Sequence, residues 1–374
     1  MNRTKSGQAG ANLLAVRSHN AALVLDLLRG AGAEGISRLE LAEGTGLTPQ
    51  AVSKITARLR EEGLATEAGH RASTGGKPRT VLRLVPDAGH AVGVHLDRDE
   101  LRAVLVDLDG VVVGERRGAL DLGAGAGAVL GVVARETTGL VADVLGGAGP
   151  ADAGSLLGIG VALPGPLDHT RGVLHRVTGF PQWDGFPLRD ALAERLGLPV
   201  VVDKDTNAAA LGLSVAGEGG SFAYLHLGTG LGAGLVIGGS VHRGPRTGAG
   251  EFGHQVVQLD GPPCECGNQG CVEALCLAAV GRGDAREAAR VLGVAAGNLV
   301  GLLDFDRVLL GGRTVAAAPE AFTGGVAEVL AARTRRESVL GGTVPVRLAP
   351  GGDRVVAEGA AQLLLAPLFG RADG

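Results

Sequence analysis

The chain is poor in aromatic residues, in sulfur and in long apolar runs. Only 2% of its 374 residues are Phe, Trp or Tyr, and it has one Met and four Cys. No apolar stretch approaches the ~20 residues that a membrane-spanning helix needs. The first ten residues, MNRTKSGQAG, lack the apolar segment of a signal peptide. Four cysteines are too few for a disulfide framework in a chain of this length. We therefore expect a cytoplasmic protein without membrane contact.

The rest of the composition is that of a folded protein with unequal charge along the chain. Hydrophobic residues make up 45% and charged residues 20%, so more than one core can be buried. Residues 1–85 hold 12 Lys and Arg against 7 Asp and Glu, a net charge of +5. Subtraction from the totals of 35 and 39 leaves 23 against 32 in the remainder, a net charge of −9. A basic N-terminal part on an acidic body is typical of a protein that meets a polyanion at one end.

Three helices are predicted in the basic part. Residues 20–29 place apolar side chains on one helical face. Ser37 and Glu40 have the spacing of a capping box, which predicts the start of a second helix. Thr48 followed by Pro49 is an N-cap with proline in the first helical position, which predicts a third helix. The second and third helices, separated by a glycine-containing turn, have the arrangement of a helix-turn-helix.

The third helix and a following hairpin carry polar side chains suited to DNA. Two β-prone stretches, 64–67 and 80–85, flank a basic tip and predict a wing. The outer face of the third helix is where a recognition helix meets the major groove. We predict a winged helix-turn-helix DNA-binding domain in residues 1–86. Its predicted DNA contacts are Thr48, Gln50, Ser53, Lys54, Arg58, Lys77 and Arg79. The alternative is a three-helix docking module with a solvated basic loop.

Beyond residue 86 the pattern changes and then repeats. Strands are predicted at 90–96 and 101–110, with a third after them, and the same strand and turn order returns from residue 222. Helical stretches join the two halves. This indicates an α/β fold, a duplicated two-lobed body of the actin-like and sugar-kinase-like (ribonuclease H-like) type with a cleft between its lobes. We assign residues 87–204 to the first lobe, 205–354 to the second, and 355–374 to a C-terminal helix that returns to the first lobe.

The two predicted copies differ in their first turn. The second copy reads GTGLG at 228–232, where backbone N–H groups are free to approach phosphate oxygens. The first copy reads His95-Leu96-Asp97-Arg98-Asp99-Glu100, in which three carboxylates oppose a bound polyphosphate and Arg98 alone does not offset them. A tight hairpin in a glycine-rich protein is the alternative for residues 228–232.

A cluster of thiols predicts a metal site. Cys264, Cys266 and Cys271 lie within eight residues, and His254 lies upstream. Three sulfurs and one nitrogen form a closed, structural zinc site. The alternative is a set of reduced cysteines in a flexible loop. Cys276, in an apolar stretch, is predicted to be a buried core thiol.

Four segments resemble successive signatures of the ROK (repressor, open reading frame, kinase) family. They are GIGVALPG at 158–165, LHLGTGLGAG at 225–234, GEFGH at 250–254 and CECGNQGCVE at 264–273. The resemblance implies that Asp205, Glu251, His254 and Glu273 bind sugar hydroxyls. It also implies that Asp205 occupies the position of the kinase base, and that kinase activity is lost because His95 to Asp99 replaces the family's Asp-x-Gly-Gly-Thr loop.

The chain departs from the family pattern in three places. Lys204 and Gly179 stand where the family usually has asparagine, so one sugar contact is missing at Gly179. Only about 35 residues separate the cysteines from the strand before Gly311 and Gly312, which implies a reduced helical subdomain. In the family these two glycines line the nucleotide side.

Together these features predict a DNA-binding transcriptional regulator of sugar metabolism genes, with repression as the expected effect. A homodimer or homotetramer would bind a double-stranded operator, and a sugar or sugar-phosphate effector would bind the cleft. The alternative is a ROK-type sugar kinase with an attached DNA-binding domain. A third class, a sugar-sensing scaffold, would use the basic part only for docking.

Overall fold

The computed structural model describes residues 19–71, 79–146, 153–177, 179–337 and 342–371. The N-terminal head within this range combines three helices with one small sheet of order β1-β3-β2. Its helices are α2 (His19–Ala31), α3 (Arg38–Thr45) and α4 (Pro49–Glu61). Its strands are β1 (Ile36–Ser37), β2 (Ala65–Arg71) and β3 (Arg79–Leu84). The predicted Lys77 lies outside the described residues.

Local side-chain chemistry sets the helix starts of the head. The Ser37 backbone N–H donates to Glu40 Oε2 at 2.8 Å, and the Glu40 N–H donates to Ser37 Oγ at 3.3 Å. The Thr48 hydroxyl accepts from the Ala51 N–H at 3.2 Å. These bonds satisfy N–H groups that a helix leaves free in its first turn. The predicted capping box and the predicted N-cap are both confirmed.

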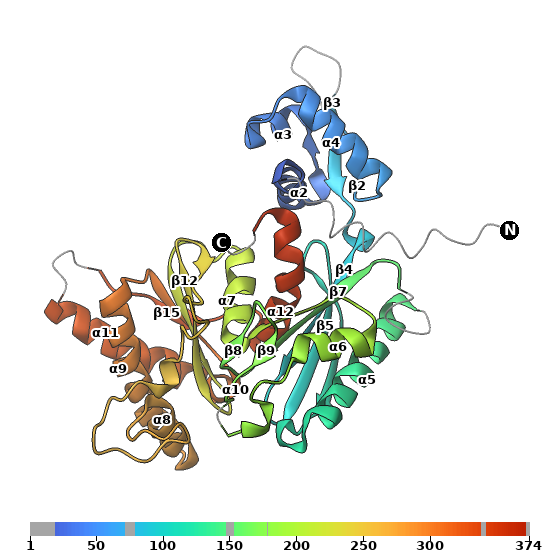
Figure 1. Cartoon of the computed structure of the whole chain (residues 1–374). Helices are drawn as coiled ribbons and strands as arrows, with labels where there is room; N and C mark the ends of the chain where they lie inside the picture. The colour runs from blue at the N-terminus through green and yellow to red at the C-terminus, as the bar shows by residue number, and fades with distance from the viewer. Residues whose placement is uncertain (1–18, 72–78, 147–152, 178, 338–341, 372–374) are drawn as a thin grey trace.

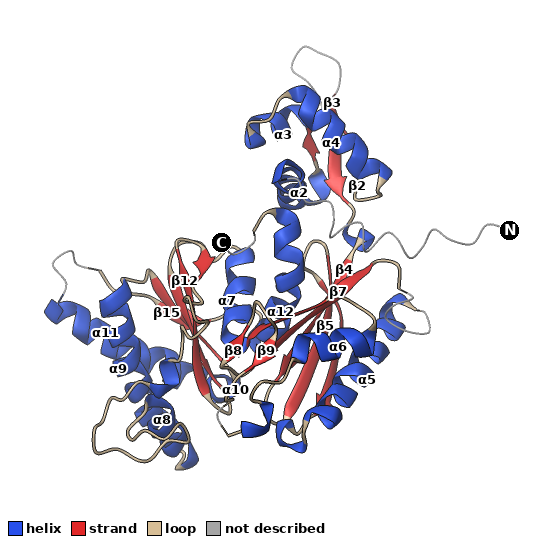
Figure 2. Cartoon of the chain, in the orientation of Figure 1, coloured by secondary structure: helices blue, strands red, loops and turns tan. Residues whose placement is uncertain are grey.

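The body consists of two five-stranded sheets with the same topology (Figure 2). In each sheet three antiparallel strands are followed by two parallel ones. The first sheet contains β4 (His90–Leu96), β5 (Glu100–Asp107), β6 (Val112–Ala119), β7 (Leu156–Leu163) and β10 (Val200–Lys204). The second contains β11 (Phe222–Leu227), β12 (Leu231–Ile237), β13 (Ser240–Val241), β14 (Arg307–Gly311) and β15 (Val346–Leu348). The predicted duplicated α/β fold is confirmed.

Helices cover the outer faces of both sheets and fill the space between them (Figure 1). The first sheet carries α5 (Ala126–Leu145) and α6 (Leu188–Leu196), and β8 (Leu167–Asp168) pairs with β9 (Val173–Leu174) beside it. The second carries α8 (Val272–Gly281), α9 (Ala285–Leu303), α10 (Arg313–Ala317) and α11 (Pro319–Glu337). Between the sheets stand α7 (Asp205–Val215) and α12 (Val355–Leu365). Among the described helices, none is long and apolar enough to cross a membrane.

Glycines let α12 lie directly on the first sheet and on α7. A Cβ atom on Gly93 of β4 would overlap the carbonyl oxygen of Ala357, and one on Gly160 of β7 would overlap that of Ala360. A Cβ atom on Gly212 of α7 would come within 2.8 Å of the Gly359 Cα. Any side chain at these positions would push the helices apart, since buried interiors are close-packed. The C-terminal helix is thus part of the core that also holds the first sheet.

The head sits on the C-terminal end of the chain (Figure 1). Helix α2 packs against the short 3-10 helix η8 (Ala366–Phe369), and apolar residues of the head, the first sheet and α12 form one continuous buried cluster. The Arg371 guanidinium donates to both carboxylate oxygens of Asp26 in α2, at 2.9 and 3.3 Å. It also donates to the carbonyl of Val215, the last residue of α7.

Candidate functional site

All four residues predicted to bind a sugar line one cleft between the two lobes. Asp205 lies at the first turn of α7, directly after β10. Glu251 and His254 lie in and beside a 3-10 turn after β13, and Glu273 lies in the first turn of α8. Main-chain segments from both sheets therefore converge on the same space. This arrangement brings hydrogen-bonding groups together in the manner of a small-molecule site.

Asp205 lies in a partly buried position with a histidine nearby. Burial raises the pKa of its carboxyl group, although His226 and Lys204 both favour the charged form. His226, on β11, also lines the cleft, and its Nδ1 lies 2.8 Å from the Tyr224 hydroxyl. Sequence reasoning missed His226. The alternation of side chains along β11, with Leu225 and Leu227 buried on the opposite face, was the available signal.

Two of the three carboxylates of this set, Glu251 and Glu273, already accept hydrogen bonds from the protein. Lys204 is buried, and its Nζ donates to Glu251 Oε1 at 3.1 Å and to the Ala249 carbonyl at 2.7 Å. Glu273 Oε2 accepts from the Leu231 N–H at 2.7 Å. Lys204, which stands where the family usually has asparagine, thus places an ammonium group inside the cleft, where it neutralises Glu251. Gly179, the other departure, lies in an exposed turn with φ of +84° and contributes no side chain.

The β4–β5 turn of the first lobe and the β11–β12 turn of the second lobe, whose sequences differ, meet on the other side of the cleft. The Thr229 hydroxyl, in the β11–β12 turn, donates to Asp97 Oδ1, in the β4–β5 turn, at 2.6 Å. Burial opposes the charge of Asp97, but this bond and the neighbouring His95 outweigh it and lower the pKa of Asp97. The bond joins the turn of the first lobe directly to the turn of the second, and both residues line the cleft.

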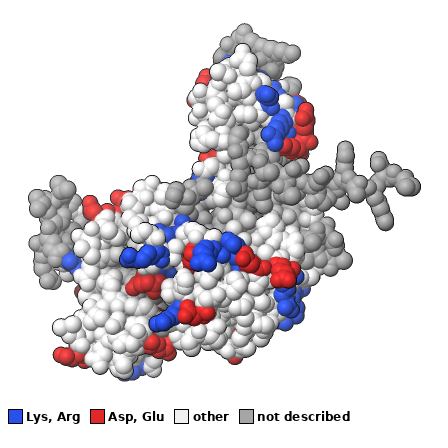
Figure 3. Space-filling view, viewed as in Figure 1, with Lys and Arg blue, Asp and Glu red and all other residues white. Residues whose placement is uncertain are grey.

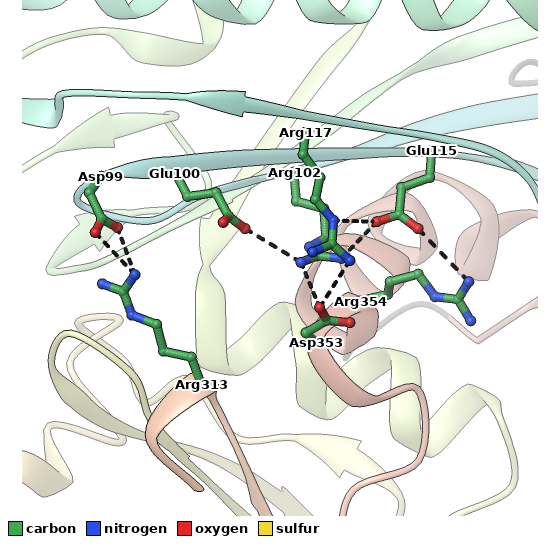
Figure 4. A network of polar contacts seen from close by, with 8 residues as sticks. All are labelled: Asp99, Glu100, Arg102, Glu115, Arg117, Arg313, Asp353 and Arg354. Carbon is green, nitrogen blue, oxygen red and sulfur yellow. Dashed lines mark hydrogen bonds and ion pairs between the residues drawn. The ribbon is translucent and has the colours of Figure 1, made fainter. Parts of the chain in front are cut away.

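The other acidic groups of the first turn are paired by arginines that sequence reasoning did not place there. Arg313, in α10, donates to Asp99 at 3.0 Å and so joins the second lobe to the first (Figure 4). Glu100 lies 3.4 Å from Arg102. Arg102 and Arg313 thus add cations to this turn beside Arg98. Arg98 Nη1 lies 3.5 Å from Glu265 Oε2, and its guanidinium lies 5.7 Å from the centre of the Phe180 ring.

A second group of ion pairs ties the first sheet to the segment that leads into α12 (Figure 4). Arg102 is buried and donates to Glu115 and to Asp353, both at 2.7 Å. Arg117 contacts the same two carboxylates at 3.0 Å. With Glu100 at 3.4 Å, three carboxylates surround the buried Arg102 guanidinium and compensate its charge.

The four predicted zinc ligands converge. The ligand atoms of His254, Cys264, Cys266 and Cys271 all lie within 4.8 Å of one another. Cys264 Sγ lies 3.7 Å from His254 Nδ1, and Cys266 Sγ lies 3.7 Å from Cys271 Sγ. Bonds of about 2.3 Å in a tetrahedron give ligand separations of about 3.7 Å, so the geometry fits Zn²⁺. Cys276 is buried in the second-lobe core, as predicted.

All of the predicted DNA-contacting side chains that the structure describes are exposed on the head. Gln50, Ser53, Lys54 and Arg58 are all exposed on α4, and Thr48 caps it. Arg58 pairs with Glu62 at 2.8 Å on the same helix. Arg79, at the start of β3, is exposed as well. Figure 3 shows basic and acidic side chains next to one another on this side of the head.

Sequence comparison connects the chain to a family of regulators and kinases. The model of the ROK family matches residues 147–280. The putative xylose repressor of Caldicellulosiruptor sp. (strain Rt8B.4) is 32% identical over 241 residues, which are 64% of this chain and 59% of that protein. The aligned part thus spans less than two thirds of that repressor.

Two solved structures resemble the chain. The ROK hexokinase from Thermus thermophilus has 30% sequence identity and a TM-score of 0.58, and the match covers 73% of this chain and 96% of that enzyme. A ROK family transcriptional regulator, described as a homologue of the E. coli MLC protein, has a TM-score of 0.74. It is 22% identical and covers 95% of this chain and 98% of that chain, so the head and the body share one fold with it.

Proposed function

We propose that this chain, which belongs to the ROK family, is a DNA-binding transcriptional repressor of sugar metabolism genes. Its head would contact the operator through α4 and the β2–β3 hairpin, and its cleft would bind a sugar or sugar-phosphate effector. The observation that carries the proposal is the combination of an exposed polar recognition surface with a cleft in which Asp205, Glu251, His254 and Glu273 converge. A sugar hydroxyl both donates and accepts, so it suits such a set of carboxylates and an imidazole.

We propose further that the body does not transfer phosphate. A kinase needs donors around the transferred phosphoryl group. Here the Thr229 hydroxyl already donates to a carboxylate of its own chain, Asp97, and Arg313 pairs with Asp99, so neither group would be free for a phosphate. In the absence of a phosphoryl donor, Asp205 would hold a hydroxyl without activating it for attack.

Helix α7 offers a direct route from the cleft to the head. It begins at Asp205, inside the cleft, and ends at Val215, whose carbonyl accepts from Arg371. Arg371 in turn holds Asp26 of the head helix α2. A sugar that draws Asp205 toward the second lobe would tilt α7 and shift the seat of the head. The ligand then favours one arrangement only by binding it more tightly.

Zinc and self-association complete the proposal. A structural Zn²⁺ held by His254, Cys264, Cys266 and Cys271 would fix the loop that carries Glu251, and it would orient the His254 ring toward the cleft.

A homodimer or homotetramer in the cytoplasm would set two heads at the spacing of two operator half-sites. A change of head position would alter that spacing and release the DNA.

The test is selection of bound duplexes from genomic fragments, followed by anisotropy titration of the selected site with and without a sugar panel. We expect at least one sugar to weaken binding, and Asp205→Asn to abolish this response while binding without sugar is unchanged. A sugar-independent affinity across the panel would contradict the switch. The kinase alternative is tested separately, because ATP-dependent turnover that Asp205→Asn abolishes would contradict the loss of phosphate transfer.

A further inference from the structure

The seam between the head and the body contains a second cavity, remote from the cleft. It measures about 160 Å³ and lies among α2 of the head, the β5–β6 turn, the end of α7 and α12. Arg29, Asp109 and Gln362 line it from three of these elements. Its wall therefore belongs to both the DNA-binding part and the effector-binding part of the chain.

Three polar atoms at this cavity are buried and have no hydrogen-bond partner among the described residues: Arg29 Nη1, Asp109 Oδ1 and Gln362 Oε1. Gln362 is only 6% exposed. Buried polar groups in native proteins are nearly always paired, so a cluster of unpaired ones requires an explanation. Their convergence on one cavity from three separate elements indicates that the missing partner is a molecule inside it.

We propose that this seam cavity is a second binding site, for a small neutral molecule that carries several hydroxyl groups. One unpaired atom is a donor and two are acceptors, and a hydroxyl group can serve both kinds. An anion would satisfy Arg29 but would be repelled by Asp109 and by Glu358, which also lines the cavity. A cation would be repelled by Arg29 and by Arg371, which lies close enough to Arg29 to disfavour its charge.

The size of the cavity agrees with a polyol or an open-chain sugar alcohol. A single water needs roughly 10–15 Å³ of such space, so about 160 Å³ exceeds the need of the three unpaired atoms. A single molecule that bonds to all three atoms costs immobilisation entropy once, whereas each of several separate waters costs it again. Such a molecule would link α2 to α12 and stiffen the seat of the head.

The surroundings of the cavity are otherwise well packed. The Arg29 guanidinium lies 4.7 Å from the centre of the Phe369 ring, and a Cβ atom on Gly110 would come within 3.2 Å of Gln362 Nε2. The first contact fixes the Arg29 side chain at the edge of the cavity, and the second shows that the absence of a side chain at Gly110 leaves room for the Gln362 amide.

The experiment is titration of the full-length protein with glycerol, erythritol and xylitol, followed by saturation-transfer NMR and calorimetry. Gln362→Leu keeps the size of the side chain but removes its polar atoms, and Asp205→Asn changes only the remote cleft. We expect xylitol to bind the wild-type chain, to bind Gln362→Leu about tenfold more weakly, and to bind Asp205→Asn as the wild type does. Asp109→Ala, in the β5–β6 turn, is the second seam variant if Gln362→Leu fails to fold.

Two outcomes would overturn the proposal. Absence of binding by every probe to the wild-type chain would mean that only water fills the cavity. Binding lost in Asp205→Asn and retained in both seam variants would place the polyol in the cleft. Neither outcome would contradict the proposed DNA binding, because its predicted contacts lie on the outer face of α4.

Discussion

Removal of the two cations on the outer face of α4 tests DNA binding most directly. Lys54 and Arg58 are both exposed, and Arg58 pairs with Glu62 on the same helix at 2.8 Å. The Arg58 side chain is 60% exposed, so this pair stabilises the helix by only about 0.3–0.5 kcal/mol. Alanine is also the best helix former. The Lys54→Ala/Arg58→Ala variant should therefore fold as the wild type does.

The expected loss is in the electrostatic part of DNA affinity. Each phosphate that a cation neutralises contributes about −0.9 to the slope of log affinity against log salt concentration. Loss of two such contacts should make the slope less negative by about 1.8. The measurement is fluorescence anisotropy of a labelled duplex at a series of salt concentrations, with circular dichroism as the check on folding.

Arg135→Ala is the matched control, because Arg135 is 63% exposed, pairs with Glu136 at 2.9 Å and lies on α5 of the body. Its slope should equal that of the wild type. An unchanged slope in the α4 double variant would refute the assignment of α4 as the DNA-contacting helix. An equal change in Arg135→Ala would show that net charge, and not the α4 face, controls the affinity.

Three further outcomes follow from the cleft and the metal cluster. Cys264→Ser should lower the bound zinc measured by mass spectrometry and the midpoint of thermal unfolding, because a tetrahedral site loses one of its ligands. Lys204→Asn should release Glu251 and strengthen binding of a neutral hexose, as measured by calorimetry; unchanged or weaker binding would show that Lys204 does not restrain the cleft. Burial lowers the pKa of His95 from 6.5 to about 3 in the folded chain. The unfolded chain then binds more protons between these values, so stability present above pH 6.5 should be lost as the pH falls toward 3, and His95→Gln should reduce this loss in urea titrations.

Short-range signals made the head and the duplicated strands predictable. The capping box at Ser37 and the proline after Thr48 act within a single helical turn, so the sequence alone predicts both helix starts correctly. The strand predicted over residues 90–96 coincides with β4. Strand β1, with only two residues, is formed by pairing with β3 and has no local signal that could reveal it.

The partners of the cleft residues were not predictable in the same way. Thr229 and Asp97 are 132 positions apart, and Arg313 and Asp99 are 214 apart. Such pairs depend on how the two lobes are placed, which no local pattern encodes. Repetition in the sequence indicated two copies with different first turns, but not that these turns would bond directly. The cysteine spacing was more informative, because a short loop restricts three thiols to one neighbourhood.

The contacts of the β4–β5 turn with the second lobe restrict how the two lobes can move. In a two-substrate enzyme both ligands draw the lobes together, and each depends on the other. Here Arg313–Asp99 and the Thr229–Asp97 bond already join the lobes on one side, so only the sugar side is left to open or close. Any motion must then turn about these contacts, and the element that spans from the cleft to the head is α7, whose end holds Arg371. A body whose lobes are already joined on one side by protein contacts would need only one effector to move its head, as the proposed sugar-responsive regulator requires.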